Sequence, residues 1–155
     1  RATDILNRES GTNPFLVQED LQDVMQKYVG IIRTADELKK GLEELKRLYQ
    51  DAGKVKAHAS PQYNPGWNAA IDLPNLLITS EAVTRAALMR EESRGGHTRS
   101  DFYFESDEWL KYNVVIRKAR DGNMEVEKVK RDDPPEELKR IAYASLEELE
   151  GTSGG

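Results

Sequence analysis

The sequence predicts a mainly α-helical fold, in which a three-helix bundle (spectrin-repeat-like) is followed by a β-hairpin and a short C-terminal helix. Apolar residues recur with helical periodicity through three successive segments between residues 16 and 93. An Asp-Gly pair at residues 121–122 separates two runs of β-prone residues, which is typical of a hairpin turn. The 155 residues suffice for one domain with its own core.

The first helix is expected in the segment VQEDLQDVMQKYVGIIR, after an irregular lead-in over residues 1–15. Its apolar positions follow the spacing of one helix face. The predicted core stripe of this helix is Leu21, Val24, Met25, Tyr28, Val29 and Ile32.

The second helix opens at Thr34, because Glu37 stands three residues later and the two form a capping-box pattern. Gly53 is the expected C-terminal stop. The predicted core face of this helix is Leu38, Leu42, Leu45 and Tyr49.

The third helix is predicted from Trp67 to about Ser93, with a bend at Pro74, which removes one backbone hydrogen bond. Leu77, Val83 and Leu88 are expected to be buried against the first two helices. Tyr63 and Trp67, just before or at the start of this helix, are interpreted as aromatic anchors of the preceding loop on the core. The bundle is therefore assigned to residues 16–104.

After the third helix the sequence pattern changes from helical periodicity to β-prone runs. Residues 105–131 are predicted as the hairpin segment, and because a lone hairpin is marginal in water we expect it to pack on the bundle or on another chain. Asp133 and Pro134 have the pattern of an N-cap and a first helical residue, which predicts a last helix within residues 132–150. Residues 151–155 read as a flexible tail.

Composition excludes several classes of function. The net charge is −5, from 23 basic and 28 acidic residues, which argues against a broad nucleic-acid-binding surface. The absence of cysteine excludes disulfides and thiolate chemistry. No apolar run is long enough to insert in a membrane, and the first residues do not resemble a secretion signal. The missing initiating Met leads us to expect a piece of a longer protein.

The segment ESRGGHTRSD, residues 92–101, has the densest set of chemically active side chains. Ser93, His97 and Asp101 suggest a catalytic triad only if a helix continued through the glycines, and no G-x-S-x-G elbow accompanies them. A phosphate cradle needs glycines before a helix, whereas these follow one. A metal site is not indicated, because the chain has only two histidines and no thiols.

Gly95 and Gly96 are therefore interpreted as the stop of the third helix, one of them with a positive φ. The charged residues around them are predicted to contact another surface, since arginine beside aromatic residues is typical of interfaces. The expected interdomain interface residues are Arg94, His97, Arg99 and Asp101. Without that partner, these side chains are expected to be exposed or in local pairs, so that alanine at Arg94 or Arg99 would barely change the stability of the chain.

Five segments, in this order, resemble a known family: MQKYVGIIR, YNPGW, AIDLPNLL, SEAVTRAAL and ESRGGHTRSD. Together they are similar to the C-terminal helical domain of succinate dehydrogenase and fumarate reductase flavoproteins, a superfamily that includes L-aspartate oxidase. The resemblance covers roughly residues 12–143. It departs from the pattern where Phe102, Tyr103 and Phe104 stand in place of a proline soon after the motif's aspartate.

The resemblance implies a parent oxidoreductase that moves a hydride between succinate and covalently held FAD in electron transport. The family's FAD-binding and substrate-binding residues lie upstream of this domain, so no catalytic, cofactor-binding or metal residue is expected in this chain, which alone would be inactive. The sequence also lacks a G-x-G-x-x-G after a predicted strand. The implied partners are the FAD domain of the same polypeptide and the iron–sulfur subunit.

The implied location is the cytoplasmic side of the cell membrane, through other subunits, or the cytoplasm. Two alternatives stay open from the sequence. One is the equivalent domain of an L-aspartate oxidase, and the other is a free-standing helical interaction module.

Overall fold

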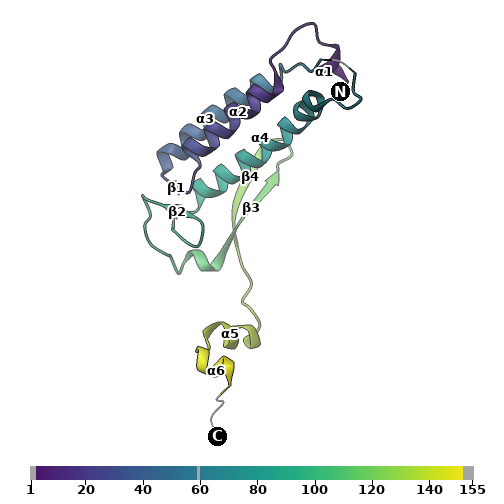
Figure 1. Cartoon of the computed structure of the whole chain (residues 1–155). Helices are drawn as coiled ribbons and strands as arrows, with labels where there is room; N and C mark the ends of the chain where they lie inside the picture. Colours follow the sequence, from purple (N-terminus) through teal and green to yellow (C-terminus); the bar gives the residue numbers. More distant parts are fainter. Residues whose placement is uncertain (1–2, 59, 152–155) are drawn as a thin grey trace.

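The computed structural model describes residues 3–58 and 60–151, and three long helices dominate it (Figure 1). They are α2 (Pro14–Tyr28), α3 (Ala35–Ala52) and α4 (Pro65–Met89), and each packs on the other two. A short helix, α1 (Asp4–Asn7), lies against α4. The main core contains Val17, Leu21, Val24, Leu45, Leu48, Val55, Ala70, Leu73 and Leu77. The mainly α-helical prediction is confirmed, while most of the expected tail lies outside the described residues.

The starts of the helices follow from their capping residues. Asn13 accepts a hydrogen bond from the backbone of Phe15 at 3.0 Å, with Pro14 as the first residue of α2. The predicted capping box is present at α3, where the Thr34 hydroxyl accepts from the Glu37 backbone and the Glu37 carboxylate accepts from the Thr34 backbone. Gly53 ends α3 as predicted, but with a helical φ of −62°.

The core stripe of the first two helices is confirmed in large part. Leu21, Val24 and Val29 are buried, and Met25 and Tyr28 are partly buried. Ile32 is 67% exposed, because α2 ends at Tyr28 and residue 32 belongs to the short strand β1 (Ile32–Arg33). Leu48 is buried on α3 although the predicted face omitted it.

Helix α4 begins and ends earlier than the periodicity predicts. It starts at Pro65, because the Asn64 side chain caps it by accepting from the backbone of Trp67 at 2.9 Å. Tyr63 is fully exposed, so the expected aromatic anchor on the core is wrong for this residue. Pro74 lies inside the helix, which continues to Met89 rather than Ser93.

The predicted burial on α4 is correct for Leu77 and partly for Leu88, but Val83 is 45% exposed. The buried positions of this helix are Ala70, Leu73, Leu77, Thr84 and Ala87. Val83 precedes Thr84 by one residue, which turns its side chain about 100° away from the core face.

The hairpin is confirmed. Strands β3 (Tyr112–Lys118) and β4 (Met124–Lys130) pair antiparallel, and Gly122 takes a φ of +88° in the connecting turn. The hairpin packs on α4, and the 3-10 helix η1 (Trp109–Lys111) leads into it. Trp109 is buried between two cations, with the Arg90 guanidinium 5.2 Å and the Lys128 ammonium 4.3 Å from its ring centre.

The single last helix is replaced by two short ones, α5 (Glu136–Tyr143) and α6 (Leu146–Glu150). Asp133 does not cap α5, because Pro135 follows Pro134 and a residue before proline disfavours the helical conformation. Ala144 is extended between the two helices, and Ser145 begins α6 with a capping box to Glu148. In the part of the chain that the structure describes, no helix combines the length and apolarity needed to cross a membrane.

Candidate functional site

The conspicuous segment, residues 90–106, forms a compact loop beyond the carboxyl end of α4. The residue after the helix, Arg90, is already extended, with φ −81° and ψ 103°. The prediction that Gly95 and Gly96 stop the helix is therefore wrong: they form a tight turn, in which the backbones of Arg94 and His97 exchange hydrogen bonds of 2.8 and 3.0 Å. Gly95 takes the expected positive φ, of +57°, in this turn.

The carboxyl end of α4 is capped by Arg99, whose side chain is only 1% exposed. One terminal nitrogen of its guanidinium donates to the carbonyl oxygens of Ala87 at 2.9 Å and Leu88 at 3.2 Å, and to that of Arg90 at 3.3 Å. A cation at this position also complements the negative end of the helix dipole. Arg99 thus stabilises the helix end in the way that was expected of the glycines.

Asp101 connects Arg99 to the start of another helix. Its two carboxylate oxygens accept from Nε and Nη2 of Arg99, both at 2.8 Å, and one of them also accepts from the backbone of Ala35 at 2.8 Å. Ala35 is the first residue of α3, where a carboxylate is favourable. The hydrogen bonds from Arg99, supported by that from Ala35, lower the pKa of Asp101 to about 2.

Glu92 is completely buried at the other side of the loop. Its carboxylate accepts from the backbone of Ser106 at 3.0 Å and from the guanidinium groups of Arg94 and Arg90. Burial raises the pKa of Glu92, but these hydrogen bonds outweigh burial and the pKa is lowered overall. Arg94 continues the network outward to Glu105 at 3.1 Å.

The His97 side chain connects the loop to the α2–α3 connection. Its Nδ1 is 3.1 Å from a guanidinium nitrogen of Arg33, and its Nε2 is 3.0 Å from the carbonyl oxygen of Arg90. Since Arg33 can only donate, the contacts fit a neutral imidazole that accepts at Nδ1 and donates from Nε2. Burial lowers the pKa of His97, and the nearby charges of Arg33, Arg99 and Arg90 lower it further.

The contacts of His97 predict a pH-dependent stability. Because the folded state lowers the pKa of His97, the unfolded chain binds the proton first as the pH falls below about 6.5. The stabilisation is therefore complete above that pH and is lost as the pH falls. We expect His97→Gln to flatten the decline of the unfolding free energy between about pH 7 and pH 5, measured by urea denaturation. His58→Gln, at an exposed position, is the matched control, and an unaltered decline in His97→Gln would contradict the assignment.

The four predicted interface residues are together in one place, where Arg99 is buried, Arg94 and His97 are half-buried and Asp101 is exposed. The short strand β2 (Thr98–Arg99) pairs in parallel with β1, and the Ser100 backbone donates to the Arg33 carbonyl at 2.9 Å. We call the side chains of Glu92, Arg94, His97, Arg99 and Asp101 the polar brace. The local pairs expected with Glu92 and Asp101 are found, whereas exposure of Arg99 is not.

The triad suggested by the spacing is not assembled. The Ser93 hydroxyl lies 2.8 Å from the backbone nitrogen of Arg99 and 2.9 Å from the carbonyl oxygen of Phe102. His97 bonds to Arg33 and Arg90 instead. Among the described residues, no cluster of three or more histidine and acidic side chains could hold a metal ion. The charged side chains of the loop bond instead to backbone groups, including those of Ala87, Ala35 and Ser106.

A group of exposed apolar residues next to the polar brace was not identified from the sequence. Four large side chains are exposed by 57–80%, and we call them the end pad: Ile31, Ile32, Tyr103 and Phe104. The Phe104 carbonyl accepts from the Ser93 backbone at 2.8 Å, and Ile32 pairs with Thr98. Tyr103, Phe104 and Arg94 also line a hollow of about 310 Å³. The adjacent pairs Ile31-Ile32 and Tyr103-Phe104 were the available indication of such a surface.

The comparisons with known proteins agree with this architecture. The family model described as "Fumarate reductase flavoprotein C-term" matches residues 18–143. A fumarate reductase (CoM/CoB) subunit of Methanothermobacter marburgensis is 32% identical over 111 residues, which are 72% of this chain and 20% of that protein. The succinate dehydrogenase flavoprotein subunit of Coxiella burnetii is 34% identical over 107 residues, 68% of this chain and 18% of that protein.

A solved structure titled "Mycobacterium smegmatis Sdh1 complex in the apo form" contains a chain that superposes with a TM-score of 0.82 at 31% identity, covering 96% of this chain and 27% of that one. This chain spans about a fifth of the length of the curated relatives described above. The matched model covers most of the sequence, and the resemblance noted in its motifs is confirmed. The chain belongs to the family of fumarate reductase flavoprotein C-terminal domains.

Proposed function

We propose that this chain is the C-terminal domain of an FAD-dependent flavoprotein subunit that interconverts succinate and fumarate. Within it, the domain buttresses the FAD domain and takes no part in the chemistry. The curated relatives described above are subunits of a fumarate reductase and of a succinate dehydrogenase, which favours this assignment over L-aspartate oxidase. FAD belongs to the parent protein in this proposal.

The observation that carries the buttress role is the outer surface of α4. Only three of its 25 residues are charged, whereas nine of the 18 residues of α3 are. One face of α4 packs on α2 and α3, and a second set of positions at helical spacing stays at least partly accessible. We call these residues, among which Asp72 carries the single charge, the apolar stripe: Ala69, Asp72, Leu76, Thr79, Val83 and Ala86.

A surface so poor in charge is typical of the centre of an interface. Between the apolar stripe and α2 lies a hollow of about 370 Å³, to which Gln18 and Leu76 contribute. Helix α1 packs on α4, so a polypeptide continuing upstream of it would emerge near the amino end of that helix (Figure 1). The stripe is therefore well placed to receive the FAD domain.

Arg94, His97, Arg99 and Asp101 contribute to this role indirectly in our proposal. They hold the backbone of the end pad, and the pad makes the contact with the neighbouring domain or subunit. The partners are the FAD domain of the same polypeptide and an iron–sulfur subunit of the complex. The parent protein would be peripheral at the cytoplasmic face of the membrane, through other subunits.

The proposal predicts that flavin and activity belong to the full-length protein only. The complete gene product should bind flavin stoichiometrically and oxidise succinate with an artificial electron acceptor, whereas residues 1–155 alone should be colourless. Flavin absorbance and succinate-dependent dye reduction measure both. Flavin bound to residues 1–155, or L-aspartate oxidation in place of succinate oxidation, would contradict it.

A matched pair of substitutions tests the buttress role separately. Leu76→Asp places a charge on the apolar stripe and should weaken flavin retention and thermal stability in the full-length protein. Because Leu76 is already 39% exposed, the same change should alter the stability of residues 1–155 little. Lys46→Asp on the charged face of α3 is the control. Equal effects of the two changes on the full-length protein would argue against the stripe as the interdomain surface.

A further inference from the structure

The two last helices form an arm whose large apolar side chains stay about half exposed or more in the described chain. We call residues 132–151 the C-terminal arm; α5 and α6 lie beyond the bundle, joined to it by an extended segment (Figure 1). Within residues 3–58 and 60–151, neither the bundle nor the hairpin packs extensively on them. The large apolar side chains of the arm are 46–87% exposed: Leu138, Ile141, Tyr143, Leu146 and Leu149.

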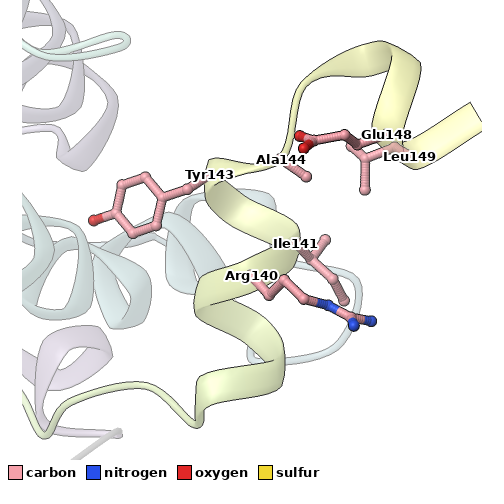
Figure 2. A pocket seen from close by; sticks show the side chains of 6 residues that line it. All are labelled: Arg140, Ile141, Tyr143, Ala144, Glu148 and Leu149. Carbon is pink, nitrogen blue, oxygen red and sulfur yellow. The ribbon is translucent and has the colours of Figure 1, made fainter.

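A hollow lies between α5 and α6 of the arm. Figure 2 shows Arg140 and Ile141 of α5 on the same side as Glu148 and Leu149 of α6, while the Tyr143 ring, which also contributes to the lining, is directed the other way. The volume of this hollow is about 540 Å³. Helices of eight and five residues are marginal in water by themselves. A surface that buries these apolar side chains would stabilise both helices.

The net charge of the arm indicates which kind of partner surface would bind it. The arm contains seven acidic and two basic side chains, and the other 21 acidic and 21 basic side chains of the chain cancel. The whole net charge of −5 therefore lies in the arm. A complementary surface must combine an apolar floor with a lysine-rich or arginine-rich rim, because like charges would repel the arm.

The position of the arm favours a separate protein chain as its partner. The arm follows β4, and the Arg131 backbone bonds to the carbonyl of Lys111 beside Trp109, which packs on Arg90 at the carboxyl end of α4. Helix α1, where an upstream domain would connect, packs on the same helix near its other end, and the 25 residues of α4 span about 37 Å. Pro134 and Pro135 keep the linker extended, so the arm points away from the bundle.

We propose that the C-terminal arm docks in a basic-rimmed, apolar groove on a different protein chain of the complex in which the parent protein works. The apolar faces of α5 and α6 enter the groove, and acidic residues such as Glu136 and Glu137 face its basic rim. The docking rests on the multi-subunit complex of the proposed function but not on which reaction the parent catalyses, so loss of the crosslink would leave the flavin and activity measurements unaffected.

Site-specific photocrosslinking in the full-length protein identifies the occupant. The photoreactive residue p-benzoylphenylalanine replaces Leu146 on the arm or, as the matched control, Lys46 on the exposed face of α3. After irradiation of the complex purified from its own host, tandem mass spectrometry locates the crosslinked peptide. We expect position 146 to crosslink to a lysine-rich or arginine-rich segment of another subunit, and position 46 to give no product.

Three outcomes would overturn the proposal: a crosslink from position 146 to the same polypeptide, a crosslink to a second copy of it, or none. The charge requirement is tested with the subunit so identified. Glu136→Lys with Glu137→Lys should weaken its binding to the full-length flavoprotein at least tenfold, with a loss that shrinks at high salt. Glu19→Lys with Glu43→Lys makes the same charge change on the bundle and should alter binding less than twofold. Equal effects of the two pairs would show that the arm does not make the contact.

Discussion

Arg99→Ala is expected to lower the free energy of unfolding of the domain by about 3–5 kcal/mol. The substitution removes a buried cation and leaves the Asp101 carboxylate without its two 2.8 Å partners. It also leaves carbonyl groups at the end of α4, including those of Ala87 and Leu88, without their donor. Urea denaturation of the chain, followed by far-UV circular dichroism, measures the loss.

Two further substitutions isolate the cause. Arg99→Lys keeps the charge but lacks the planar fork that contacts Asp101 and the helix end together, so it should recover only part of the stability. Arg117→Ala removes an exposed pair with Glu127 on the hairpin and should cost about 0–1 kcal/mol. If Arg99→Ala cost no more than Arg117→Ala, the guanidinium would not be the brace that its contacts indicate.

The expected loss of stability contradicts the sequence-based prediction that Arg99→Ala would barely change it. The reason is that the contacts of Arg99 are distant in sequence. Charges after a helix usually belong to a solvated face, but arginine beside aromatic residues led us to expect this side chain at an interface. Its acceptors on α4 are 11 and 12 residues away, and the Asp101 carboxylate that it binds accepts from the backbone of Ala35, 66 residues away in sequence. Only the packed arrangement of α3 and α4 brings these groups together.

Features set by neighbouring residues were predictable. The capping box of Thr34 and Glu37 and the hairpin turn at Gly122 depend on residues a few positions apart. A positive φ at Gly95 or Gly96 was also expected, and Gly95 has it, although its use in a turn was not predicted. The end of α4 was missed because a distant arginine, not a glycine, satisfies its last carbonyl groups.

In the candidate site, too, local features were predictable from the sequence and features set by distant contacts were not. The motif identified which residues gather in one loop, but their orientation follows from the burial of Glu92 and Arg99. The end pad was missed although adjacent apolar pairs indicated it, since apolar residues are normally interpreted as core and exposure depends on tertiary position. The break between α5 and α6 at Ala144 likewise interrupts a segment that the sequence predicts as one helix.

Leu77→Ala is expected to lower the free energy of unfolding by about 2–5 kcal/mol, since it opens a cavity in a packed core. Leu77 is completely buried and belongs to the same core cluster as Leu45 on α3 and Leu21 on α2. A cavity at this position weakens the contacts among all three long helices at once. The midpoint of urea denaturation should fall without a change in slope if the unfolding remains cooperative.

Val83→Ala is the matched control on the same helix. The sequence predicts that both residues are buried, but Val83 is 45% exposed on the apolar stripe, so its truncation in residues 1–155 should change the stability by no more than about 0.5 kcal/mol. Similar losses for the two substitutions would mean that α4 is rotated from the orientation described. In the full-length protein the proposed buttress role gives a different expectation: Val83→Ala should become destabilising, because the FAD domain would bury that side chain. The change in the Val83 effect between the two proteins therefore tests the interdomain surface, while the Leu77 effect tests the bundle itself.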